Sequence, residues 1–187
     1  MRKLLFVLLS GLIVACIGVV LYSAKYTVIN DKKQLEDNII RFINRPSVVA
    51  NNIDIKQELN LDNKKYVLFI INNSLGEAEL TKGFNNKYKI ETAGYGSSFY
   101  TDEINKTNKG KYLIILGKNY ENKIAYIKIL LDDKEYKISI PKQEYFIVNC
   151  AVPIETQQEF VGGGNSTKFY NNNDIDITEE MSKVLFQ

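Results

Sequence analysis

The chain has 187 residues, with 24 Lys and Arg, 22 Asp and Glu, and no histidine. The lack of histidine excludes Ser-His and Cys-His catalysis, histidine metal ligands and a histidine pH switch. Arg2 and Lys3 carry the net charge of +2, so the rest of the chain is neutral and lacks the excess of cations typical of nucleic-acid-binding proteins. We therefore expect no nucleic-acid partner.

The chain begins with an uncharged, mostly apolar stretch from Leu4 to Ala24. As a helix this stretch would be about 31 Å long, close to the hydrocarbon thickness of a bilayer. Positively charged flanks stay in the cytoplasm, and Arg2 and Lys3 precede the stretch. Residues 1–24 are therefore predicted to be a signal-anchor, a single transmembrane helix with a cytoplasmic N-terminus and a C-terminal domain outside the cytoplasm.

Two alternatives to a retained membrane span stay open. Ile13-Val14-Ala15-Cys16 resembles the lipobox at which bacterial lipoproteins are cut and lipidated, which makes Cys16 the candidate lipidation site. Against lipidation, the chain remains apolar after Cys16, where a lipoprotein continues as a polar tether. Ordinary cleavage after Ala24 would place Tyr22 where signal peptidase requires a small side chain. The retained span is favoured over both.

Residues 25–52 are predicted to connect the anchor to the domain and to contain a helix over residues 31–44. Leu35, Ile39, Phe42 and Ile43 recur at helical spacing, and Arg45-Pro46 ends the pattern. We expect this helix to pack on a sheet, rather than to continue the span or to lie flat near the membrane surface.

From residue 53 the apolar pattern changes to a period of two, which indicates β-strands. Residues 53–160 are predicted to form a mostly β, antiparallel β-sandwich-like domain with short flanking helices. One face of the first strand is expected to carry Ile53, Ile55, Leu59 and Leu61. Further strands are expected at residues 66–71, 77–81, 88–92, 112–116, 124–131, 136–140 and 144–152.

Three of these segments predict details of packing. The continuous apolar run Tyr66–Ile71 is typical of a central strand that is buried on both faces. Asp132-Asp133 predicts a tight hairpin turn between its flanking strands. Cys150 is expected to be a buried core thiol, because it shares one strand face with Phe146, Val148 and Val152.

The sequence contains a candidate repeat. Residues 65–73 resemble residues 111–119, and Tyr88-Lys89-Ile90 resembles Tyr136-Lys137-Ile138 with a two-residue slip. A true repeat would give two related β-meanders and a two-sheet sandwich. Chance recurrence in a sequence rich in Lys, Tyr and Ile explains the similarity equally well, so both interpretations stay open.

Residues 161–187 are predicted to be a glycine-rich joint followed by a C-terminal helix. The segment at residues 162–166, Gly-Gly-Gly-Asn-Ser, is typical of a flexible linker. Asp176 is expected to cap the helix, with Glu179 completing a capping box. The helix face that docks on the domain is expected to carry Ile177, Met181, Val184 and Leu185.

Thr92-Ala93-Gly94-Tyr95-Gly96 resembles the selectivity filter of potassium channels. That filter needs a membrane span on each side, and no second long apolar stretch follows it, so the segment is interpreted as a glycine turn. Tyr95, Phe99 and Tyr100 are candidates for an exposed contact loop at one end of the sandwich. Packing in the core is the favoured alternative for these aromatic residues.

The sequence contains no Walker loop, CxxC pair, nucleophile elbow or HExxH motif, and no catalytic, cofactor-binding or metal-binding residue is assigned. The oxygen-rich residues 171–180 lack the central glycine and the final glutamate of a calcium-binding EF-hand loop. We therefore expect no cofactor and no enzymatic activity. The sequence favours a membrane-anchored binding, sensing or accessory module of a bacterial cell envelope, with a protein partner at the outer membrane face. The alternatives are a pilin-like structural subunit and an exported hydrolase that uses carboxylates.

Overall fold

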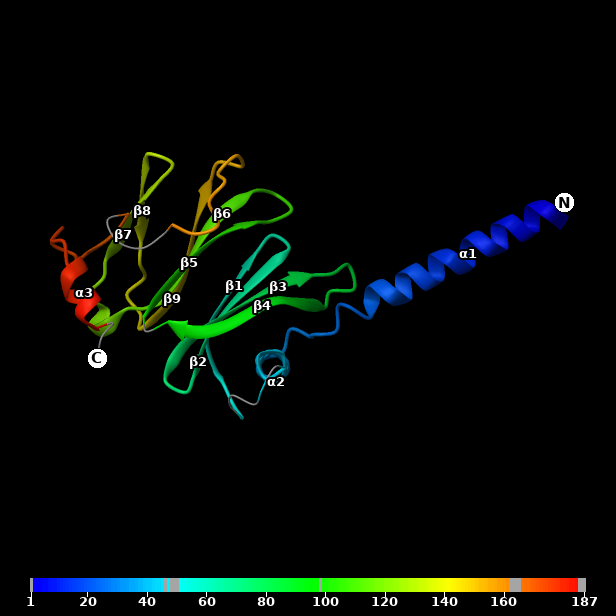
Figure 1. Ribbon diagram of the computed structural model, residues 1–187, viewed down its shortest axis with the longest axis horizontal. Helices are drawn as coiled ribbons and strands as arrows, with labels where there is room; N and C mark the ends of the chain where they lie inside the picture. Colours follow the sequence, from blue (N-terminus) through cyan, green and yellow to red (C-terminus); the bar gives the residue numbers. More distant parts are fainter. Residues whose placement is uncertain (1, 46, 48–50, 98, 162–165, 185–187) are drawn as a thin grey trace.

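The computed structural model describes residues 2–45, 47, 51–97, 99–161 and 166–184. Within these residues, ten strands form three antiparallel sheets, accompanied by three α-helices and one short 3₁₀ helix (Figure 1). The prediction of a mostly β, sandwich-like fold with short helices is confirmed.

The first sheet has the strand order β1-β2-β3-β4, the second β5-β6-β9 and the third β10-β7-β8. The strands of the first sheet are β1 (Asp54–Leu61), β2 (Lys64–Ile71), β3 (Ser74–Lys82) and β4 (Tyr88–Ser97). Those of the second are β5 (Tyr100–Lys106), β6 (Lys111–Lys118) and β9 (Tyr145–Val152). Those of the third are β7 (Tyr126–Leu131), β8 (Lys134–Ser139) and β10 (Thr167–Tyr170). The helices are α1 (Arg2–Ser23), α2 (Lys32–Ile43), η1 (Tyr120–Asn122) and α3 (Thr178–Val184).

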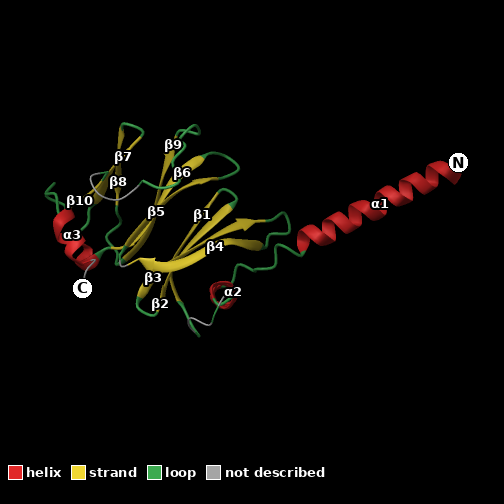
Figure 2. Ribbon diagram, in the orientation of Figure 1, coloured by secondary structure: helices red, strands yellow, loops and turns green. Residues whose placement is uncertain are grey.

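The layers are stacked in the order α2, first sheet, second sheet, third sheet with α3, and three hydrophobic cores lie between them (Figure 2). Strands β2 and β6 are buried on both faces and join adjacent cores. Phe69 of β2 packs in the core beneath α2, whereas Leu68 packs against Ile114 of β6. Ile115 of β6 lies in the core with the third sheet. A two-sheet sandwich was expected, whereas the structure stacks three sheets.

Local turn chemistry explains the tight hairpins. Asn72 and Asn73 have φ angles of 49° and 64°, and they close the β2–β3 hairpin in two residues. Asp132 and Asp133 have φ angles of 50° and 60° and do the same between β7 and β8, as predicted. Asn and Asp tolerate the left-handed conformation that the favoured two-residue hairpin turns require.

The prediction that Ile53, Ile55, Leu59 and Leu61 share one face of the first strand is wrong. The register of β1 against β2 shifts between Ile55 and Gln57, which is a β-bulge. Because a one-residue shift turns the following side chains to the opposite face, Ile55 lies in the core beneath α2, whereas Leu59 and Leu61 pack against the core of the second sheet.

The two matched segments of the candidate repeat form β2 and β6. β2 is one of the two inner strands of the first sheet, and β6 is the central strand of the second sheet. The meander predicted for the second copy does not form, because β6 pairs with β5 and β9 while β7 belongs to the third sheet. A two-residue hairpin follows β2, but η1 separates β6 from β7 and allows the chain to change sheets.

The C-terminal segment joins the third sheet. β10, a strand that was not predicted, pairs with β7. Ile177 and Met181 of the α3 region are buried in the same core, as predicted. Asp176 accepts a hydrogen bond from the backbone N–H of Thr178 at 2.9 Å, which satisfies a donor at the helix start. The predicted glycine-rich joint at residues 162–165, and Leu185 of the predicted docking face, lie outside the described residues.

Helix α1 projects away from the sheets, and its described side chains from residue 8 to residue 21 are exposed (Figure 1). The sequence analysis predicted a transmembrane helix in this stretch. Among the residues that the structure describes, no helix combines the length and the apolar character needed to cross a membrane, so this part of the predicted fold is unsupported. Helix α2 instead packs on the first sheet, as expected, through Leu35, Ile39 and Ile43.

A glycine faces a phenylalanine ring across each of two central strand pairs. Gly76 of β3 pairs with Phe69, and a Cβ atom at Gly76 would lie 2.2 Å from that ring. Gly117 of β6 pairs with Phe146, and a Cβ atom there would lie 2.7 Å from the ring. Each ring therefore occupies the space that a larger residue at the glycine would need.

We expect Gly76→Ala to destabilise the protein by about 1–3 kcal/mol, because the fully buried Phe69 ring has no room to move aside. Gly94→Ala in the adjacent strand is the matched control, since a Cβ atom there meets nothing within 4 Å. This control should change the free energy of unfolding by less than about 0.5 kcal/mol. Chemical denaturation of both variants measures the difference. Equal stabilities would show that the core yields around Phe69.

Candidate functional site

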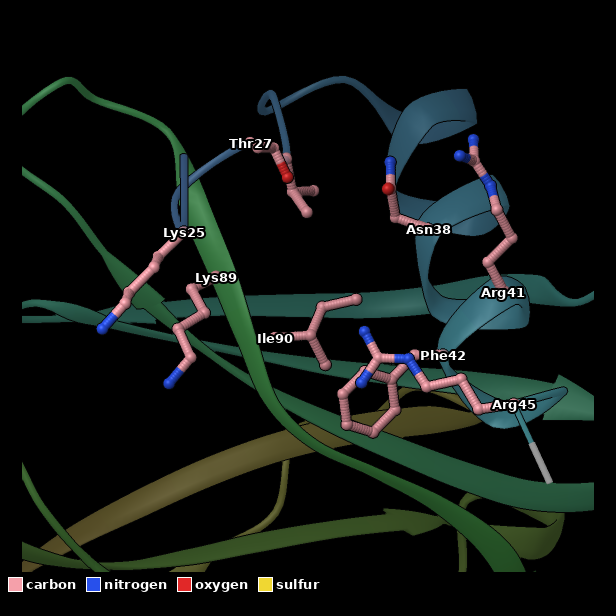
Figure 3. Close-up of a pocket in the computed structure, with 9 residues that line it drawn as sticks. Lys25, Thr27, Asn38, Arg41, Phe42, Arg45, Lys89 and Ile90 are labelled. Atoms are coloured by element: carbon pink, nitrogen blue, oxygen red, sulfur yellow. The ribbon is translucent and has the colours of Figure 1, made fainter. Parts of the chain in front are cut away.

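A basic groove lies beside the end of α1, between the connector that follows α1, helix α2 and strand β4 (Figure 3). Its volume is about 540 Å³. Nine residues line it: Lys25, Thr27, Val28, Asn38, Arg41, Phe42, Arg45, Lys89 and Ile90. Four of them are cationic and none is acidic, so the groove concentrates positive charge in a domain whose overall charge is balanced.

The connector forms one wall of the groove because it is hydrogen-bonded to the edge of the first sheet. The Val28 N–H donates to the Tyr88 carbonyl at 3.0 Å, and the Tyr88 N–H donates to the Val28 carbonyl at 2.7 Å. Val28 is buried, whereas Lys25 and Thr27 remain exposed at the rim. This pairing places Lys25 on the same side of the groove as Lys89 of β4 (Figure 3).

Helix α2 forms the opposite wall. Asp31 caps its N-terminus by accepting a hydrogen bond from the Gln34 N–H at 3.0 Å. The apolar stripe of the helix is buried on the sheet, so the neighbouring stripe that carries Asn38, Phe42 and Arg45 faces the groove. The groove is therefore a direct consequence of the amphipathic pattern of α2.

Specific contacts hold three of the four cationic side chains. The Arg45 guanidinium lies 4.2 Å from the centre of the Phe42 ring, a cation–π contact inside the groove (Figure 3). Arg41 leans back along α2 and donates from Nε to the Asp37 carbonyl at 3.2 Å. Lys89 is 2.6 Å from the carboxylate of Glu91. Burial raises the pKa of Glu91, but the hydrogen bonds from Lys89 and Thr81, together with the charges of Lys89 and Lys64, outweigh burial and lower the pKa.

Lys89 is the only one of the four cations in the groove with a carboxylate neighbour among the described residues. Among the described residues, no carboxylate oxygen lies within 4 Å of the charged nitrogens of Lys25, Arg41 or Arg45. Their positive charges are therefore available to an anion that enters the groove.

Aromatic side chains join the end of α1 to the domain next to the groove. The Tyr22 ring stacks on Tyr26 at 4.6 Å and on Phe84 of the β3–β4 turn at 4.0 Å between ring centres. Asn85 in the same turn donates to the Tyr26 carbonyl at 3.1 Å. We call Tyr22, Tyr26 and Phe84 the aromatic stack. It places the end of α1 against the first sheet.

The structure separates the residues predicted for a contact loop. Tyr95 lies in β4 and is 44% exposed. Phe99 is buried in the core of the third sheet, and Tyr100 packs against that core with its ring edge-on to Phe169. Cys16, the candidate lipidation site, is exposed in α1. Cys150 is half-buried at the edge of a core rather than fully buried, because β9 is an edge strand of the second sheet.

The basic groove was not predicted from the sequence, because its residues come from segments that are distant in the sequence. One local signal was present. The chain contains only three arginines, and two of them, Arg41 and Arg45, are four residues apart. Arg41 lies in the last turn of α2 and Arg45 directly follows its C-cap, so the end of this helix is marked by two arginines.

A pair of carboxyl groups lies between the first two sheets. Glu77 of β3 faces Glu103 of β5, and burial together with the charge of Glu103 raises the pKa of Glu77 to about 7. The hydroxyl of Thr101 acts in the opposite direction. The buried Oε2 atom of Glu77 receives no hydrogen bond from the described residues. This pair is the part of the described structure that best fits the predicted alternative of a carboxylate-dependent hydrolase.

No protein-family model, curated protein or solved structure matches this chain. Its function is therefore inferred from the groove, the helix and the carboxyl pair themselves.

The Glu77 carboxyl should make stability depend on pH. Its pKa of about 7 in the folded protein exceeds the ordinary value of 4.5, so the folded state holds a proton that the unfolded state releases. Stability should fall as pH rises from about 5 to 8, by on the order of 1–3 kcal/mol. Glu77→Gln should remove this fall and make the protein more stable than wild type at pH 8. Chemical denaturation of both proteins at several pH values between 5 and 8 measures this change in the free energy of unfolding.

The exposed substitution Glu155→Gln is the control and should leave the pH dependence of the wild type unchanged. If Glu77→Gln and wild type lose stability in parallel over this range, then Glu77 is not the group that titrates.

Proposed function

We propose that this chain is a membrane-anchored, non-enzymatic binding module of a bacterial cell envelope. In this proposal α1 is the anchor, the sheets lie outside the cytoplasm, and the basic groove captures an anionic ligand. The observation that carries the proposal is that four cationic side chains and no acidic one line a single groove immediately beyond an apolar helix.

The exposed apolar surface of α1 supports a membrane anchor. Its described large apolar side chains between residues 6 and 21 are more than half exposed, including Phe6 at 74% and Val20 at 66%. Burying one such side chain away from water contributes roughly 1.5–3 kcal/mol. A lipid environment would bury them together, and large exposed apolar patches mark contacts with partners or membranes. Arg2 and Lys3 favour a cytoplasmic N-terminus.

The groove supports the choice of an anion. A guanidinium presents parallel N–H donors that match two oxygens of a carboxylate or phosphate, and the contact with Phe42 holds Arg45 in a defined position. Lys25 supplies positive charge from the opposite wall, where Lys89 is paired with Glu91. Exposure of the groove keeps its cations hydrated when it is empty. A single phosphate or carboxylate group can therefore reach them without a rearrangement of the sheets.

A specific observation favours a second candidate, the exported carboxylate-dependent hydrolase. Glu77 has a raised pKa beside a second carboxyl group, which is the arrangement that separates an acid from a base. The two candidates differ in the residues they require. A hydrolase would lose activity in Glu77→Gln, whereas anion capture would be unaffected by that substitution. The pilin-like alternative predicts ordered assembly of the chain and gives the groove no role.

The anchor can be tested with Cys16→Ala. If α1 is retained as the anchor, wild type and Cys16→Ala should both stay in the membrane fraction after an alkaline carbonate wash, and intact mass should show the full-length chain. An accumulated precursor in the variant, together with a lipid on the wild type, would establish lipidation at Cys16. A wild type that is shortened by about 24 residues without lipid would establish cleavage.

Anion capture can be tested by titrating the full chain in non-ionic detergent with inorganic pyrophosphate. Arg41→Gln/Arg45→Gln should weaken binding at least about tenfold, because each lost charge-assisted hydrogen bond contributes about 1.5–3 kcal/mol. Lys106→Gln/Lys134→Gln is the matched control. It removes the same charge from exposed positions on the other two sheets and should bind like wild type. Calorimetry measures the affinities, and equal affinities for all three proteins would exclude the groove as the site.

A further inference from the structure

We propose that the anion held in the groove is the phosphate of a lipid headgroup from the membrane that α1 occupies, so that the lipid fixes the orientation of the sheets on the bilayer. This inference rests on the proposed function, and it names the ligand of the same groove. A free phosphate shares the chemistry of the headgroup, so the test below includes both sources.

The position of the groove at the end of α1 favours a lipid headgroup as its ligand. Lys25 lies two residues beyond Ser23, the last residue of α1, so the rim of the groove begins where the apolar helix ends. Tyrosine side chains at the ends of membrane-inserted helices sit at the level of the lipid headgroups. The aromatic stack is placed at this level, and its Phe84 is 65% exposed on the β3–β4 turn. The groove thus opens beside the plane in which lipid phosphates lie.

The groove is also fixed to the end of α1. The two hydrogen bonds between Val28 and Tyr88, and the one from Asn85 to the Tyr26 carbonyl, tie the connector to the first sheet. The opposite wall is equally fixed, because the buried stripe of α2 packs on the same sheet. The groove therefore stays close to the membrane surface as long as α1 is inserted.

The groove is lined by both apolar and cationic side chains, which favours a lipid over a small soluble anion. Val28, Phe42 and Ile90 add apolar surface to a groove whose other side chains are cationic or polar (Figure 3). A small soluble anion gains little from such surface. The phosphate of a phospholipid is bonded to glycerol and acyl chains, so one molecule presents both an anion and apolar groups. The groove matches this combination, with Arg45 as the group that binds the phosphate oxygens.

The test uses the full chain in vesicles of phosphatidylcholine alone or with 30% phosphatidylglycerol, and measures amide hydrogen exchange at residues 38–45 and 88–92. Phosphatidylglycerol should slow exchange at both walls of the groove by at least about threefold, while exchange in the third sheet stays unchanged and serves as the internal reference. Arg41→Gln/Arg45→Gln should remove the slowing. These arginines are exposed, so both proteins should have the same circular dichroism spectrum.

Lys33→Gln/Lys87→Gln is the matched control for diffuse attraction to an anionic surface. Both lysines are exposed close to the connector but do not line the groove, so this variant should keep the full slowing. If it loses the slowing as completely as the arginine variant does, the effect is diffuse attraction and the inference is wrong.

A final arm adds inorganic phosphate to the phosphatidylcholine vesicles. If phosphatidylglycerol slows exchange at the groove and soluble phosphate does not, the result supports a lipid headgroup as the ligand. If only soluble phosphate slows exchange at the groove, the groove binds a free anion, so the proposed function stands and the lipid inference falls. If neither ligand acts and pyrophosphate also fails to bind in detergent, both proposals fall.

Discussion

Burial of strand β2 on both faces is the constraint on which the rest of the structure depends. Its Phe69 face forms the core beneath α2, and its Leu68 face forms the core shared with the second sheet. A strand in this position has no solvated face, and even Lys65 is only 1% exposed, with its ammonium group paired to Glu58 of β1. A buried charge is tolerated only when it is paired, so this contact also holds the edge strand in register.

The groove follows from the same constraint. Because one face of β2 must be covered, α2 packs across the first sheet, and the flank of the helix then stands opposite the connector at the edge of β4. No cationic side chain has to be buried to build this arrangement, since Lys25, Arg41 and Arg45 are all exposed. The positive groove therefore costs the fold little stability, and its residues can change without disturbing the cores.

Local patterns in the sequence were sufficient to predict those strands and turns whose residue types clearly indicate one structure. The apolar run at 66–71 predicts a central strand, and Asp132-Asp133 predicts the hairpin turn between β7 and β8, because both depend on neighbouring residues alone. Strand β5 was not predicted, because Ile104 is its only fully buried side chain and the other residues are largely polar. The bulge in β1 has no local signal either. It follows from pairing with β2, so the faces of that strand could not be assigned from periodicity.

The groove could not be predicted as a site, because Lys25 and Lys89 are brought together only by the pairing of the connector with β4. The overall neutrality of the domain correctly removes a general attraction to polyanions, but it says nothing about where charges of one sign gather. The choice between lysine and arginine says more about the groove than the net charge does. The chain uses lysine for nearly all of its positive charge, yet two of its three arginines lie beside the groove, Arg41 in α2 and Arg45 just beyond the end of that helix. Lysine keeps a surface soluble equally well, whereas the planar guanidinium fork adds paired hydrogen bonds to an oxyanion. The use of arginine at these two positions therefore favours recognition of an anion over a merely solvated helix face.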